Sequence, residues 1–124
     1  MQEVINTRAA LEGELRKALE HQQFRLHYQV QVDSSQRPVG AEALIRWVHP
    51  ERGLVSPADF IPLAEETDLI LPIGQWVLQT ACAQLNAWAR DEQTRNLVLA
   101  VNISAKQFHQ ADFATELDLS LIHI

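Results

Sequence analysis

Two runs of alternating apolar and polar residues, at 24–32 and 39–48, constrain this chain more than any other feature. Apolar residues occupy every second position from Phe24 to Val32 in the first run, and from Val39 to Trp47 in the second. Such alternation is typical of strands with two different faces. Because only the turn-forming segment 33–38 separates the runs, we expect the two strands to be antiparallel neighbours.

Helical patterns lie on both sides of this hairpin, together with one further strand. Ser56 followed by Pro57 is a typical helix start, and the apolar run that ends at Asn102 is typical of a strand covered on both faces. The other predicted elements are an amphipathic helix over 3–21, a helix from Ser56, a helix from Pro72, a strand over 97–103 and a helix over 105–117. This order indicates an α/β fold.

Composition narrows the class of protein. The chain has 124 residues, of which 47% are hydrophobic, and a net charge of −6. It can therefore build the core of one domain at most, and its acidic balance argues against DNA or RNA binding. A lone cysteine, Cys82, cannot form an internal disulfide, and no apolar stretch is long enough for a membrane span. We therefore expect a cytoplasmic location, with any membrane anchor lying in another part of a longer protein.

A second polar pattern lies within the hairpin. Glu42 and Arg46 share one face of the second strand with Leu44 between them, opposite the apolar face. Buried charges cost several kcal/mol each unless they are paired or bind a ligand. Two interpretations follow: a Glu42–Arg46 ion pair on a solvated edge strand, or a ligand site. Gln29, on the first strand of the hairpin, and Asn102, near the end of the strand over 97–103, add two neutral amide oxygens that can act as ligands.

These residue types favour a hard cation. Carboxylate and amide oxygens suit Mg²⁺, Mn²⁺ or Ca²⁺ better than Zn²⁺, and the five histidines show no metal-binding spacing. The sequence also lacks a glycine-rich phosphate loop and the common arrangements around a nucleophilic serine or cysteine. The residues alone therefore predict an α/β domain with a hard-metal and anion site.

An ordered series of motifs resembles the first part of the EAL domain, a family named after the tripeptide found here at 42–44. The series consists of Tyr28-Gln29, Glu42-Ala43-Leu44-Ile45-Arg46-Trp47, His49-Pro50, Gly53, Ser56-Pro57, Phe60-Ile61, Ala64-Glu65 and Val101-Asn102-Ile103-Ser104. The resemblance implies a (β/α)₈ TIM-type barrel with an antiparallel first strand, of which this chain would be a partial barrel truncated after about three strands.

The same resemblance implies an activity and a set of site residues. It implies hydrolysis of cyclic di-GMP to pGpG, dependent on Mg²⁺ or Mn²⁺. Glu42, as the catalytic carboxylate, and Asn102 resemble the first two metal ligands of the family. Gln29, the Leu44 backbone and Arg46 resemble its contacts to the cyclic dinucleotide, with Arg46 at a phosphate.

The sequence also departs from the family pattern. Val30 stands where the family usually has proline, and the family's later acidic ligands, including a paired-aspartate motif, and its catalytic lysine have no counterpart here. We expect residues 1–21 to form a helix leading into the domain and residues 22–118 to form the N-terminal portion of an EAL domain. The segment 119–124, LSLIHI, resembles a translated sequencing adaptor and is predicted to be a non-native tail.

These expectations leave alternatives for the parent protein. One is that the parent is a catalytically degenerate EAL module that binds cyclic di-GMP or only a protein partner. Another is that this chain is itself a free-standing short protein that forms a non-enzymatic interaction module. Two further expectations concern the parent: that it forms a homodimer, and that it is fused to upstream sensory or diguanylate cyclase-type domains. The 124-residue polypeptide alone is expected to be inactive and unstable, because an interrupted barrel leaves strand edges unpaired.

Overall fold

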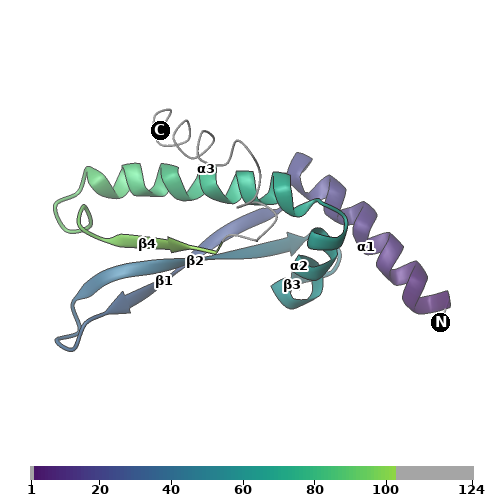
Figure 1. Cartoon of the computed structure of the whole chain (residues 1–124), viewed down its shortest axis with the longest axis horizontal. Coiled ribbons are helices and arrows are strands. Elements are labelled where there is room, and N and C mark those ends of the chain that lie inside the picture. Colours follow the sequence, from purple (N-terminus) through teal and green to yellow (C-terminus); the bar gives the residue numbers. More distant parts are fainter. Residues whose placement is uncertain (1, 103–124) are drawn as a thin grey trace.

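The computed structural model describes residues 2–102, and the side chains of residues 8–102 (Figure 1). The predicted helix over 105–117 and the segment 119–124 lie outside the described residues. The predicted order of elements is otherwise confirmed, with one additional strand. The elements are α1 (Gln2–Glu20), β1 (Phe24–Val32), β2 (Pro38–His49), β3 (Gly53–Val55), α2 (Pro57–Glu66), α3 (Ile70–Ala89) and β4 (Val98–Val101).

Strand β2 is the centre of the sheet. Strand β1 pairs with it antiparallel along one edge, with Phe24 opposite Trp47, so the predicted hairpin is confirmed. The other edge of β2 is shared: β4 pairs in parallel with its first half, and β3 pairs antiparallel with its last three residues. Because β2 has neighbours on both edges, the interpretation of Glu42 and Arg46 as a pair on an edge strand is wrong.

Two local predictions differ from the structure. Strand β3 was not predicted, because three residues that follow a turn are too few to show alternation. The positive φ of Gly53, +74°, lets the chain turn into this short strand. Helix α3 begins at Ile70 rather than at Pro72, since proline is tolerated in a first turn whose N–H groups have no helical partners. The predicted start of α2 is confirmed: the Ser56 hydroxyl accepts a hydrogen bond from the Ala58 N–H.

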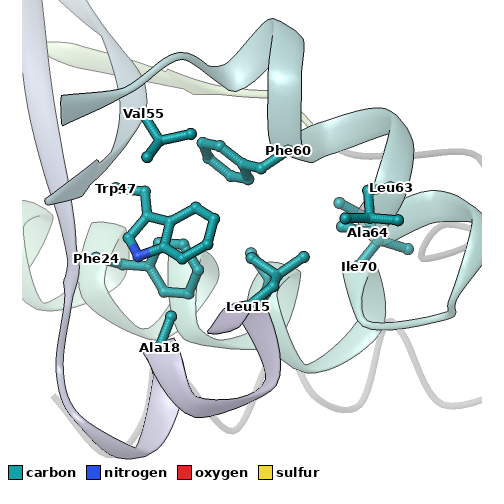
Figure 2. Close-up of a cluster of buried hydrophobic side chains, with 10 residues drawn as sticks. Leu15, Ala18, Phe24, Trp47, Val55, Phe60, Leu63, Ala64 and Ile70 are labelled. Carbon is teal, nitrogen blue, oxygen red and sulfur yellow. The ribbon is translucent and has the colours of Figure 1, made fainter. Parts of the chain in front are cut away.

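One face of the sheet packs against the helices. Figure 2 shows Trp47 and Phe24 from the hairpin meeting Phe60 of α2 and Leu15 of α1, and all four side chains are buried. Figure 1 shows α3 running along the strands, and its buried Ile73 joins the same core. The alternation in β1 and β2 therefore places one set of side chains in the core and the other set, which includes Glu42 and Arg46, on the opposite face.

The opposite face of the sheet is open in the described part of the chain. Strand β4 was predicted to be covered on both faces, and this is wrong for residues 98–101: Val98 is 70% exposed and Ala100 is exposed as well. Both residues share the face of Glu42, because Ala100 is its register partner. No helix within residues 2–102 has both the length and the hydropathy needed to cross a membrane.

Gly40 sets how closely β4 approaches β2, and we predict that Gly40→Ala separates the two strands. A Cβ at this position would lie 2.6 Å from the Val98 carbonyl oxygen, well inside van der Waals contact. We expect a loss of about 1–3 kcal/mol in the free energy of unfolding, typical of overpacking. Chemical denaturation of the full-length protein measures it. Gly13→Ala is the matched control, since a Cβ there meets nothing within 4 Å. An equal loss in both variants would contradict the strand-contact explanation.

Candidate functional site

The open face brings three of the sequence-predicted residues together. Gln29 lies directly opposite Glu42 in the β1–β2 register, and Ala100 lies next to Glu42 on the other side. Asn102 lies two residues after Ala100, directly after the end of β4, so its side chain comes to the same face. Its Nδ2 donates a hydrogen bond of 3.2 Å to the Glu42 Oε1 atom. The Glu42 carboxylate thus contacts the Asn102 amide, and Gln29 lies beside them on the neighbouring strand.

This donor set fits part of a hard-cation shell. Glu42 offers two carboxylate oxygens, and the Asn102 amide offers one oxygen once its amide group rotates to turn Oδ1 toward the carboxylate. Hard cations take six or more oxygen ligands, many of them water molecules. Within residues 8–102 no cluster of three or more His, Cys, Asp or Glu side chains could complete the shell. The described residues therefore fit a cation that also takes ligands from elsewhere.

The backbone around Leu44 is left open by the sheet topology. Strand β4 pairs with residues 40–43 of β2, and β3 pairs with residues 47–49. Between them, on this edge, residues 44–46 have no partner strand among the described residues. Backbone N–H and C=O groups are strong hydrogen-bonding groups that need a partner. The gap between β3 and β4 therefore leaves main-chain groups of residues 44–46 without a strand partner in the described part of the chain.

Two cavities flank this gap. One, of about 320 Å³, has Leu44 and Asn102 at its wall and continues between β2, α2 and α3, where Ile61 and Ile73 make it largely apolar. The second, of about 300 Å³, is lined by Arg46, by β3 and by the start of α2. Four of the five predicted residues thus lie at one sheet opening, in contact with a cavity or with each other.

Arg46 does not pair with Glu42. Its Nη1 donates to the Ile45 carbonyl oxygen at 3.0 Å, and within residues 8–102 no carboxylate forms an ion pair with it. Arg25, which the sequence analysis did not single out, lies directly opposite Arg46 in the hairpin register. The short turn of the hairpin was the signal that could have placed these two arginines together.

Two other side chains with reactive groups, those of His49 and Cys82, have structural roles away from this site. His49 is buried; its Nδ1 accepts from the Glu51 and Arg52 N–H groups, both at 3.0 Å, and its Nε2 lies 3.2 Å from Glu14 Oε2. These bonds tie the β2–β3 turn to α1. Burial raises the pKa of the Cys82 thiol, which keeps it protonated and a poor nucleophile.

Comparison with known proteins gives a consistent result. The profile of the EAL domain family matches residues 12–123. The bifunctional diguanylate cyclase/cyclic di-GMP phosphodiesterase MucR of Pseudomonas aeruginosa is 50% identical over 99 residues, which cover 79% of this chain and 14% of MucR. The cyclic di-GMP phosphodiesterase PdeR of Escherichia coli is 46% identical over 107 residues, covering 86% of this chain and 16% of PdeR.

Solved structures agree with the sequence matches. The P. aeruginosa MucR phosphodiesterase in complex with c-di-GMP superposes with a TM-score of 0.87 and 43% identity, covering 92% of this chain and 46% of that one. The Xanthomonas citri FimX EAL domain in complex with c-di-GMP gives a TM-score of 0.81 at 26% identity, covering 99% and 47%. The chain therefore spans about half of these structures and about one sixth of the curated relatives described above.

Proposed function

This chain belongs to the EAL domain family, and from that premise we propose that it forms the N-terminal portion of a domain that hydrolyses cyclic di-GMP to pGpG with Mg²⁺ or Mn²⁺. The observation that carries the proposal is the meeting of Glu42 and Asn102 across β2 and β4, with a hydrogen bond of 3.2 Å. Relatives named as cyclic di-GMP phosphodiesterases support the substrate.

Each site residue has a role in the proposed reaction. Glu42 and Asn102 would hold a divalent cation, which supplies electrophilic activation of the phosphodiester and a lowered pKa for water. Arg46 would donate two parallel charged hydrogen bonds to a phosphate, as its planar guanidinium allows. Gln29 and the open Leu44 backbone would orient the dinucleotide by neutral hydrogen bonds. Local positive groups thus offset the net charge of −6, which would otherwise repel a dianionic substrate.

Removal of the cation tests this proposal. We expect the full-length protein to convert cyclic di-GMP to pGpG, and we expect a chelator to abolish the reaction and added Mg²⁺ or Mn²⁺ to restore it. Chromatographic separation of the two nucleotides measures the rate. The expected loss is complete within detection, because the cation would supply both the electrophilic activation of the phosphodiester and the lowered pKa of water that the reaction needs.

The same assay separates the second candidate function. A full-length protein that binds cyclic di-GMP but produces no pGpG at any Mg²⁺ or Mn²⁺ concentration is a binding module rather than a phosphodiesterase. Turnover that persists at full rate in excess chelator contradicts the proposed role of Glu42 and Asn102.

A further inference from the structure

Two arginines face each other on the open side of the sheet. Arg25 of β1 and Arg46 of β2 are direct register partners, so their side chains lie on the same face with Cβ atoms about 5 Å apart. Like charges directly opposite one another in antiparallel strands are destabilising. This is the same face that carries Gln29 and Glu42.

Among residues 8–102, no acidic side chain compensates this pair. The Arg25 Nη1 donates to the carbonyl oxygens of Gln22 at 2.6 Å and Phe24 at 2.7 Å. Among the described residues, the Arg46 guanidinium donates only to the Ile45 carbonyl. Within residues 8–102, neither arginine has a carboxylate within ion-pair distance. Elsewhere on this acidic chain, Arg8, Arg16 and Arg52 each pair with a glutamate. Each guanidinium carries five N–H donors, so most donors of the pair are available to a ligand.

We propose that Arg25 and Arg46 together bind one phosphate group of the cyclic dinucleotide, which makes Arg25 a substrate-binding residue; this rests on the proposed function. Arg46 lies four residues beyond Glu42, about 13 Å along an extended strand. A phosphate held at the arginines is therefore not the one positioned at Glu42 and Asn102. A ligand with two phosphodiesters supplies one group for each position, and a cavity of about 300 Å³ lies beside Arg46.

Arg25 has one competing explanation. Its bonds to the Gln22 and Phe24 carbonyls could serve to fix the connection between α1 and β1, where Gln22 has a positive φ of 53°. The two roles predict opposite effects on stability. Removing a structural clamp lowers the midpoint of thermal unfolding, whereas removing one of two facing positive charges leaves the midpoint of the ligand-free protein unchanged or raises it.

The test uses the full-length protein in excess chelator, so that binding is measured without hydrolysis. Cyclic di-GMP and inorganic pyrophosphate are titrated separately by calorimetry into wild type, Arg25→Gln and Arg25→Lys. We expect Arg25→Gln to bind both about tenfold more weakly, as for the loss of one charged hydrogen bond, and Arg25→Lys to be intermediate. Arg37→Gln is the matched control: it removes the same charge at an exposed position whose described hydrogen bonds are made by its backbone. It should change affinity less than twofold.

Each outcome bears on a different claim. Binding of cyclic di-GMP by Arg25→Gln within twofold of wild type overturns the arginine pair and leaves the proposed function standing. Loss of pyrophosphate binding in this variant, with no cyclic di-GMP binding by wild type, supports the pair, and the turnover assay with Mg²⁺ or Mn²⁺ then decides the proposed function. An unfolded Arg25→Gln, or one with a lowered thermal midpoint, shows a structural clamp and overturns the pair. Failure of wild type to bind either ligand overturns the arginine pair and leaves the proposed function to the turnover assay.

Discussion

Glu42→Ala is expected to lower the rate of cyclic di-GMP hydrolysis by the full-length protein about a thousandfold, while the protein stays folded. Glu42 is the carboxylate at the point where β1, β2 and β4 meet, and it accepts the 3.2 Å hydrogen bond from Asn102. Without it, the proposed cation loses a charged ligand and Asn102 loses its partner. Removal of one group that stabilises transition-state charge typically costs 10²–10³-fold. Steady-state production of pGpG measures the effect.

Two further variants separate charge from shape. Glu42→Gln keeps the size of the side chain and a carbonyl oxygen that can still accept from Asn102 Nδ2, so it should preserve the local structure and still lose most activity. Glu51→Gln removes the same charge from an exposed position in the β2–β3 turn, and turnover should remain within twofold of wild type. Unchanged turnover in Glu42→Ala would falsify the role of this carboxylate.

Much of the fold could be predicted because alternation and helix-start signals are local. The bounds of β1, 24–32, match the predicted run, and Ser56 caps α2 as expected. The juxtaposition of Glu42 with Gln29 also follows from the short turn, since a tight hairpin determines the register of its strands. The contact between Glu42 and Asn102 joins residues 60 positions apart. The sequence predicted a polar patch at the end of a strand, but not the hydrogen bond between these two side chains.

Other features could not be read from local patterns. Whether the face that carries Val98 is covered depends on which elements pack against it, and a run of apolar residues does not distinguish a covered strand from an open one. The division of one β2 edge between β3 and β4, which leaves 44–46 open, is a property of the topology. In the sequence, Arg25 looks like any polar residue on the exposed face of a strand. Its register with Arg46 is what shows that the two arginines face each other.

Trp47→Ala is expected to lower the free energy of unfolding by about 3–5 kcal/mol, the range for truncating a large buried aromatic. Trp47 is fully buried, and its ring centroid lies 6.0 Å from that of Phe24 and 5.6 Å from that of Phe60. Its Nε1 also donates to the Gln23 side-chain oxygen at 3.0 Å. Since native domains have only about 5–15 kcal/mol of stability, this single change removes much of it. Denaturant titration followed by circular dichroism measures the loss.

Two control variants show which part of the Trp47 side chain stabilises the fold. Trp47→Phe keeps an aromatic ring and loses only the indole N–H, so it should cost clearly less than alanine. Trp88→Ala removes a half-buried tryptophan that contacts Tyr28, 5.5 Å away between ring centroids, and should also cost less than Trp47→Ala. Because Trp47 alternates with Arg46 on β2, its packing fixes the strand that presents the arginine. Equal losses in all three variants would show that the described core does not hold β2 in place.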